Sequence, residues 1–278
     1  MPKAYVHLLD AVHYRRDAFV NGFARLGYIV ERGTPAVPLA PDDVVVIWNK
    51  TPRSAQALRM ARKNGAAVLV AENGYFGKDV NGHQPYALAL DGHNGSGRWF
   101  APDSSRLDRL SVPFEPVRAP GMLGKVLIAD QRGIGSQKMR SPPKFGVQML
   151  ERLTHHQPFR QIELRAHPGR HKADVSLERD LEDCDALVVW SSNCATLALQ
   201  KGIPVHYCAP AIASAGAAKP FMPSLRATFT EEERREAFAR MAWAQWFLDE
   251  IASGEAMRTL LDVYAGTLPS VSPGIDLA

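Results

Sequence analysis

The chain has 278 residues, which is enough for one large domain or for two domains of ordinary size. Apolar residues make up 46% of the sequence, so a disordered chain is excluded and a packed core is expected. The residues that follow Met1-Pro2-Lys3 do not have the pattern of a signal peptide. No apolar run reaches the roughly 18 residues of a membrane helix. We therefore expect a soluble, cytoplasmic protein with no membrane partner.

The net charge and the cysteines indicate which partners and which cysteine roles are to be expected. The formal net charge is +4, with basic clusters such as 138–144 and 165–172. These clusters fit either a polyanionic partner or a solvated surface with a phosphate pocket. The three cysteines are odd in number and form no CxxC pair, so we expect small buried side chains rather than a disulfide or metal site.

In the first part of the chain, strand patterns alternate with helix patterns. Apolar strand runs are predicted at 4–9, 28–32, 44–48 and 67–71. An amphipathic helix is predicted at 17–26, and a second one opens at Thr51-Pro52 and stops at Gly65. From residue 72 to about 118 the alternation stops, and we expect a long glycine-rich loop followed by a linker at 113–121.

The same alternation restarts in the second part. Strands are predicted at 125–129, 162–165, 186–190 and 205–207, and helices at 143–153, 194–201, 230–251 and 255–264. Thr230 and Glu233 form a capping box at the start of the third of these helices. We predict an α/β fold of two Rossmann-like halves with parallel sheets, residues 1–120 and 121–278. The C-terminal helices are expected to pack across, and the working site to lie in the cleft between the halves.

Three polar loops follow predicted strands of the second half. Ser191-Ser192-Asn193 stands before a helix, where hydroxyls, free backbone N–H groups and the helix dipole favour an anion, although the same residues also suit a simple N-cap. Arg165 and His167 point the same way on an extended chain and suit a diphosphate or a nucleoside, or else a basic surface turn.

The third loop, 130–137, contains Gln131, Arg132 and Gly133 and is rich in glycine. It matches neither GxGxxG nor GxxxxGK[ST], which argues against nucleoside-triphosphate hydrolysis and standard dinucleotide binding. Because parallel strands end at the same sheet edge, all three loops are expected to converge there.

The order of these motifs resembles the nucleotide-sugar half of GT-B glycosyltransferases, and most of all the capsular polysaccharide transferases. The resemblance covers about 125–207: a glutamine-bearing turn, Arg-x-His-Pro, and Ser-Ser-Asn-Cys-Ala-Thr. Sugar 2-epimerases of similar fold share part of it. The chain departs from the pattern in its short length and in having Gln131-Arg132 where Gln-Pro is expected. The resemblance implies donor contacts from His167, Ser191, Ser192, Asn193 and Thr196.

A catalytic base is expected from the first half. Glu72 directly follows a buried strand, and Asp91 and His93 lie in the glycine-rich loop. Each has a side chain able to take the proton of an attacking hydroxyl. Structural alternatives are a salt bridge or cap for Glu72 and a backbone hydrogen bond for His93.

No metal site is predicted, because Pro168-Gly169 interrupts the helix that the nearby histidines would need, and no Asp-x-Asp motif occurs. The sequence thus indicates a metal-independent glycosyltransferase with no cofactor besides its nucleotide-sugar co-substrate. The acceptor hypotheses are a capsule-type polysaccharide and a 5-hydroxymethylpyrimidine in duplex DNA. The DNA hypothesis rests on the net charge and a faint similarity of 243–246 to phage enzymes that sugar-modify their DNA. An epimerase and a non-catalytic nucleotide-sugar-binding protein remain as alternatives.

Overall fold

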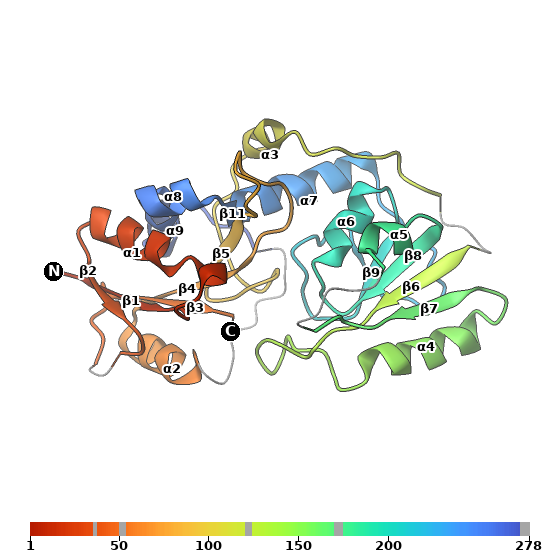
Figure 1. The fold of residues 1–278 in the computed structure, drawn as a ribbon, viewed down its shortest axis with the longest axis horizontal. Coiled ribbons are helices and arrows are strands. Elements are labelled where there is room, and N and C mark those ends of the chain that lie inside the picture. The colour runs from red at the N-terminus through yellow and green to blue at the C-terminus, as the bar shows by residue number, and fades with distance from the viewer. Residues whose placement is uncertain (36–37, 50–53, 120–123, 170–174, 273–278) are drawn as a thin grey trace. The chain divides into compact units, whose positions relative to one another are not determined.

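The structure is a computed structural model that describes residues 1–35, 38–49, 54–119, 124–169 and 175–272. Its contacts divide the chain into two compact units, each built on one sheet (Figure 1). The first unit comprises 1–106 together with 240–272, and the second comprises 107–239. Thr51 and Pro52, predicted to open a helix, lie outside the described residues.

The sheet of the first unit has the strand order β11-β5-β4-β3-β1-β2. Strands β1 to β4 pair in parallel, whereas β5 and β11 are antiparallel to their neighbours. The parallel strands match four predicted runs, and in β1, β3 and β4 buried apolar side chains fill a sheet covered on both faces. The bounds are β1 Lys3–His7, β2 Ile29–Arg32, β3 Val44–Trp48, β4 Ala67–Asn73, β5 Tyr86–Leu90 and β11 Gln245–Trp246.

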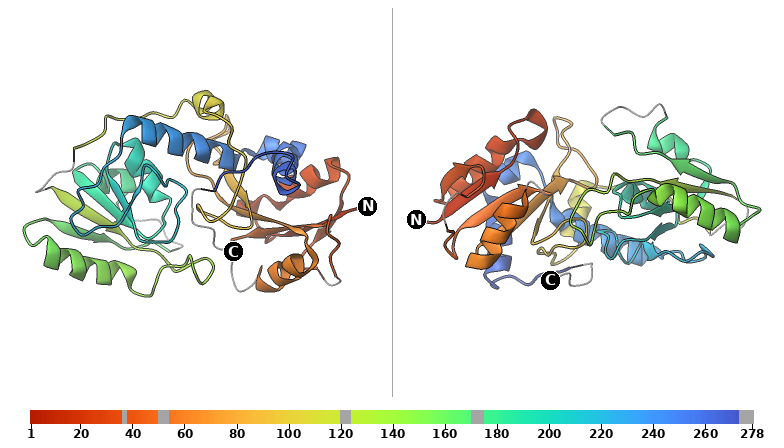
Figure 2. Two further views of the ribbon diagram at one scale, coloured as in Figure 1. Left: turned by 180° about the vertical axis from the view of Figure 1, so that it is seen from behind. Right: turned by 90° about the horizontal axis from the view of Figure 1, so that it is seen from below.

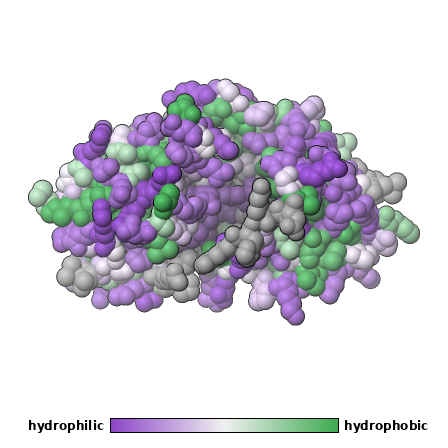
Figure 3. Space-filling model, in the orientation of Figure 1, coloured by the Kyte–Doolittle hydropathy of each residue, from purple (hydrophilic) through white to green (hydrophobic). Residues whose placement is uncertain are grey.

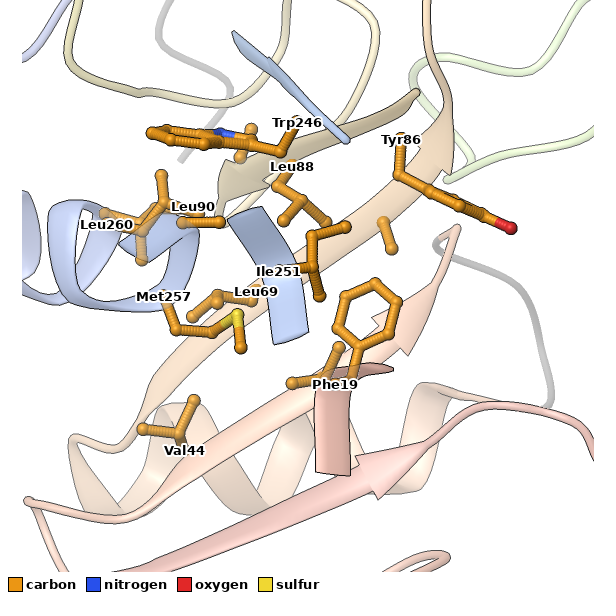
Figure 4. Close-up of a cluster of buried hydrophobic side chains, with 14 of the residues drawn as sticks. Phe19, Val44, Leu69, Tyr86, Leu88, Leu90, Trp246, Ile251, Met257 and Leu260 are labelled. Atoms are coloured by element: carbon orange, nitrogen blue, oxygen red, sulfur yellow. The ribbon is translucent and has the colours of Figure 1, made fainter. Parts of the chain in front are cut away.

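Helices cover both faces of this sheet. Helix α2 packs on one face, while α1, α8 and α9 cover the other, where Phe19, Ile251 and Met257 meet the apolar side chains of β3 to β5 (Figure 4). Gly65, in the left-handed conformation, ends α2 as predicted. The bounds are η1 Val12–Tyr14, α1 Arg16–Arg25, α2 Ala55–Asn64, α8 Leu248–Ser253 and α9 Glu255–Tyr264.

The glycine-rich region is not one long loop, which corrects the prediction for residues 72–118. Strand β5 lies inside it, fully buried and hydrogen-bonded to β4, and α3 (Ser105–Leu110) follows further on. The five residues Tyr-Ala-Leu-Ala-Leu stand among glycines and polar residues that favour a loop, so their strand pattern was not recognised. The strand is stabilised by pairing with β4 and with β11, which is about 160 residues away in the sequence.

The predicted long helix 230–251 also needs correction. Helix α7 (Glu231–Ala244) ends where Gln245 and Trp246 leave it to pair with β5. The Gln245 side-chain oxygen accepts hydrogen bonds from the backbone N–H groups of Tyr75 (2.9 Å) and Phe76 (3.2 Å), and Trp246 is 1% exposed. The chain after residue 240 therefore belongs with the first sheet and not, as the boundary at 120 implied, with the second half.

The sheet of the second unit has the order β10-β9-β8-β6-β7, and among the described residues all of its strands pair in parallel. Helix α4 lies along one face, and α6 packs on the other (Figure 2). The capping box at the start of α7 forms as predicted, with Thr230 and Glu233 exchanging hydrogen bonds. The bounds are β6 Lys125–Ala129, β7 Ile162–Arg165, β8 Cys184–Val189, β9 Val205–Tyr207, β10 Lys219–Pro220, α4 Phe145–His156, α5 Leu177–Asp180 and α6 Cys194–Gln200.

The surface is consistent with the composition. Hydrophilic residues cover most of the face drawn in Figure 3, and hydrophobic ones are scattered in small groups. Within the described residues, no helix has both the length and the apolar character needed to cross a membrane.

The close approach of α1 to α8 gives a stability prediction. A Cβ at Gly22 would overlap the Ile251 carbonyl oxygen and the Met257 side chain, so Gly22→Ala should destabilise the protein by about 1–3 kcal/mol despite the better helix propensity of alanine. Urea denaturation measures the change. Asn21→Ala, at the exposed position beside it, is the control and should cost nothing. Equal stability of the two variants would contradict the packing of the C-terminal helices described above.

Candidate functional site

The three polar loops of the second unit meet at the carboxyl edge of its sheet, as the sequence predicts. Strands β7, β6 and β8 are neighbours, so their carboxyl ends lie side by side. The Gln131 side-chain oxygen accepts a hydrogen bond from the Ser191 backbone N–H at 2.6 Å. The Asp130 backbone N–H donates to the Arg165 carbonyl at 3.0 Å. One edge thus joins residues that are up to 60 positions apart.

The Ser191-Ser192-Asn193 loop differs from the prediction in one respect. Its backbone N–H groups were expected to be free for an anion, but that of Ser191 is bound by Gln131, and that of Cys194 donates to the Ser192 hydroxyl at 3.3 Å. The Thr196 N–H donates to the Asn193 carbonyl at 3.0 Å, and Thr196 is 3% exposed. The Ser192 hydroxyl therefore binds the first N–H group of α6, although the N-cap residue is Asn193, which makes no side-chain capping hydrogen bond.

Arg165 and His167 have different environments. The Arg165 guanidinium forms an ion pair with Asp180 and donates to the Val175 carbonyl at 3.0 Å, so its charge already has a counter-ion. The exposed His167 accepts the Gly169 N–H at Nδ1 (2.9 Å). Partial burial and the positive charge of Arg132 hold the His167 pKa below its usual 6.5. The ring is accordingly neutral at pH 7 and carries its proton on Nε2, where it can donate to a ligand oxygen.

The glycine-rich turn after β6 is held in place by its first residue, Asp130. The Asp130 carboxylate accepts the N–H groups of Gln131 (2.9 Å) and Gly146 (3.2 Å), which ties the turn to the start of α4. Gly133 has φ +65°, a conformation that L side chains rarely adopt. Arg132, which stands between Gln131 and Gly133 in the sequence, is exposed at this edge. The turn thus presents one cationic side chain on a rigid backbone.

Glu72 lies at the carboxyl end of β4, inside the strand rather than after it, opposite Ala87 of β5. Burial raises the pKa of its carboxyl to about 7, although a hydrogen bond from the Asn49 side chain opposes the shift. The Oε2 atom is buried and has no hydrogen-bond partner among the described residues. A carboxyl that ionises near neutral pH with a vacant acceptor position is suited to take a proton.

The neighbours of Glu72 at this edge are polar and aromatic. Asn49, directly after β3, has φ 55° and donates its backbone N–H to the Ala71 carbonyl at 3.1 Å. Trp48 lies edge-on to Tyr14 (4.9 Å between ring centroids) and to Tyr86 (5.8 Å). This half-buried aromatic cluster was not identified from the sequence, because its members are 72 positions apart.

The other two candidate bases lie at the opposite edge of the same sheet. Because β5 is antiparallel to β4, its carboxyl end is at the amino end of the parallel strands, where the Asp91 N–H donates to the Val68 carbonyl at 3.0 Å. Asp91 also pairs with Arg98 (3.1 Å), and His93 sits in a turn closed by Ser96. About four residues of extended chain, roughly 13 Å, separate position 87 from Asp91. The structure does not bring Asp91 or His93 together with Glu72.

A cavity of about 720 Å³ lies in the second unit on the α4 side of the sheet. Trp190, Cys208 and Phe221 line it from the chain that follows β8, β9 and β10, and Gln148 and Arg152 line it from α4. None of the donor-binding residues predicted from the sequence belongs to this lining. The spacing of Gln148 and Arg152, four positions apart on one helix, is the sequence feature that points to it.

Comparisons with known proteins agree with this architecture. No protein-family model matches the sequence, and no curated protein matches it. Two solved structures of KpsC from Thermosulfurimonas dismutans are similar. The beta Kdo 2,4 transferase has a TM-score of 0.50 and the beta Kdo 2,7 transferase one of 0.53, each at 15% identity. The matches cover 86% of this chain and 89% and 90% of those chains, respectively. The chain thus has an α/β fold of two Rossmann-like halves like that of these glycosyltransferases.

Glu72 gives a test of the site that needs no substrate. Its pKa is raised from 4.5 to about 7 by folding, so the folded protein binds the proton more tightly, and stability falls as pH rises through this window, by up to about 3 kcal/mol. Glu72→Gln removes this loss of stability at high pH, because the glutamine side chain does not ionise. The variant should match wild type near pH 4.5 in urea denaturation and gain relative stability up to pH 8. Glu151→Gln, at an exposed position, should show no such trend. Parallel pH profiles of wild type and Glu72→Gln would show that Glu72 titrates normally.

Proposed function

We propose that the protein is a glycosyltransferase that moves a sugar from a nucleotide-sugar donor to a hydroxyl acceptor. The observation that carries the proposal is Glu72, a buried carboxyl with a pKa of about 7 at the carboxyl edge of the first sheet. The fold likeness to two Kdo transferases supports this reaction class over the epimerase and the non-catalytic binding protein. The donor is assigned to the loops at the carboxyl edge of the second sheet.

Each unit has residues whose chemistry suits one part of such a transfer, the first unit for the acceptor and the second for the donor. Glu72 takes the proton from the acceptor hydroxyl, whose oxygen attacks the anomeric carbon of the donor sugar. The bond between that carbon and the phosphate oxygen breaks, and the nucleotide leaves with the electron pair. His167, with its proton on Nε2, donates a hydrogen bond to the leaving phosphate, and Arg132 adds positive charge.

Two acceptors are consistent with the sequence. The likeness to capsule enzymes favours a saccharide acceptor, and Kdo is the first donor sugar to test because both structural neighbours are named for it. The second acceptor is a hydroxymethylpyrimidine in duplex DNA, which the net charge of +4 favours.

A transfer assay tests the function and the base together. Labelled nucleotide sugars, with activated Kdo among them, are offered with an oligosaccharide, hydroxymethylated duplex DNA and unmodified DNA. We expect label in the oligosaccharide. Glu72→Gln should lower the rate by about 10²–10⁴-fold at unchanged donor affinity, the usual contribution of a general base. Asp91→Asn is the matched control and should retain activity, because Asp91 lies at the other edge of the sheet. Isomerised donor without transfer would identify an epimerase, and label in modified DNA alone would establish the second acceptor.

Donor binding is tested separately. His167→Ala should weaken nucleotide affinity by about 1–3 kcal/mol, the scale for losing a hydrogen bond to a charged group. His156→Ala, an exposed histidine at the end of α4, serves as the control. Isothermal titration with the free nucleotide measures both. Arg165 is a poor test residue, since its removal leaves Asp180 without its partner. Unchanged affinity in His167→Ala would remove this histidine from the donor site.

A further inference from the structure

The excess positive charge of the chain is concentrated in one stretch. Residues 131–160 contain six of the 33 Lys and Arg residues but only one of the 29 Asp and Glu residues, Glu151. The remaining 27 basic and 28 acidic residues give the rest of the chain a net charge of −1, so the net charge of +4 arises within this stretch. It comprises the turn after β6, helix α4 and the segment that leads to β7. The proposed transfer uses only Arg132 among these cations.

Two of the cations lie on the outer side of α4. The helix packs on its sheet through Phe145, Met149 and Leu153, and its other side faces away from the sheet (Figure 1). Lys144, directly before the helix, and Arg152 within it are exposed. They are about two helical turns apart, so they lie along one stripe of the helix surface.

The turn before α4 continues this surface with a third cation, the exposed Arg140. The carbonyl of the preceding residue, Met139, accepts the Trp190 indole N–H at 2.7 Å. The same indole lies edge-on to Phe145 of α4, with 5.6 Å between the ring centroids, so the turn is held beside the start of the helix. No ion pair of the described residues involves any of the three cations, which leaves their charge available to a partner.

Exposed apolar side chains lie near these cations. Phe159, just beyond the end of α4, is 89% exposed, Met222 is 59% exposed, and Val147 is exposed on the helix itself. The segment that contains Met222 is tied to the end of α4, because the Gln157 side-chain amide donates to the Pro223 carbonyl at 2.9 Å. Large apolar side chains gathered among cations on a protein surface indicate a partner that offers both negative charge and an apolar layer.

We propose that this surface, the α4 surface, binds a lipid bilayer that contains anionic lipids. The α4 surface consists of Arg140, Lys144, Val147, Arg152, Phe159 and Met222. Its cations attract the lipid phosphates, and its apolar side chains enter the boundary between the headgroups and the acyl chains. Duplex DNA and acidic polysaccharides offer negative charge without an apolar layer, so the apolar side chains favour the bilayer.

This proposal revises the expectation of no membrane partner. That expectation rested on the lack of an apolar run of membrane length. Binding at a lipid surface needs no such run, because only side chains enter the bilayer.

Helix α2 of the first unit provides a matched control. Arg59, Arg62 and Lys63 are exposed on it, as three cations are on the α4 surface. No large apolar side chain of α2 is exposed. Helix α2 therefore has the same charge without the apolar component.

The test is sedimentation of the full chain with vesicles. We expect binding to vesicles of equal parts phosphatidylglycerol and phosphatidylcholine, weakening as salt is added, and none to phosphatidylcholine alone. Replacing Arg140, Lys144 and Arg152 together by Gln should lower binding about 100-fold, the usual effect of three cations near a charged membrane. Phe159→Ser should lower it about tenfold. Replacing the three cations of α2 by Gln should leave binding as in wild type.

The outcomes do not depend on sugar transfer, so they are separate from the proposed function. Failure of wild type to sediment with the anionic vesicles overturns the proposal. An equal loss of binding in the α2 variant also overturns it, because net charge alone would then account for binding. If unmodified duplex DNA binds and vesicles do not, the surface is a nucleic-acid interface and the lipid proposal is wrong. Phe159→Ser decides the test if the triple variant of the α4 surface fails to fold, since Phe159 makes little contact with the protein.

Discussion

A buried arginine holds the first unit together, and the rest of that unit depends on it. Arg106, 4% exposed, donates to the carbonyls of Ala242 (2.8 Å) and Gln245 (2.9 Å) and forms a two-pronged ion pair with Glu250. Its guanidinium also lies 4.5 Å from the Trp246 ring centre. A charge buried in this way is tolerable only with all of these partners in place. The chain after α7 must therefore turn back along the first sheet, which adds β11 at its edge and lays α8 and α9 on its open face.

The mixed direction of this sheet decides which polar residues share an edge. Where strands are parallel, as throughout the second sheet, residues that follow them gather at one edge, and Gln131 and Ser191 are hydrogen-bonded there. One antiparallel strand, β5, carries Asp91 to the opposite edge from Glu72. The same residue types in the same order would have formed one cluster had β5 been parallel. Strand direction, more than residue type, thus separates Glu72 from Asp91 and His93.

The sequence predicts those parts of the structure that depend on local pattern. The strands at 44–48 and 125–129 have the predicted bounds, because continuous apolar runs bounded by turns are typical of buried parallel strands. Strands β5 and β11 escape prediction because each is stabilised by a partner far away in the chain. The same holds for the site. Glu72 was identified from its place after an apolar run, whereas the loss of free N–H groups at Ser191 depends on the distant Gln131, and the Arg152 cavity on four separate segments.

The two-part construction of the first unit has a consequence for how the protein folds during synthesis. Residues 107–239 contain all the strands of the second sheet, so that sheet is complete once they have emerged from the ribosome. The first unit, although most of it precedes the second in the sequence, lacks β11, α8 and α9 until residue 264 has been made. Until then the apolar face around Phe19 and Leu69 stays open to solvent. Domains usually mature from the N-terminus onward. Here the order is reversed: residues 1–106 are translated before 107–239 but reach their final packing after them.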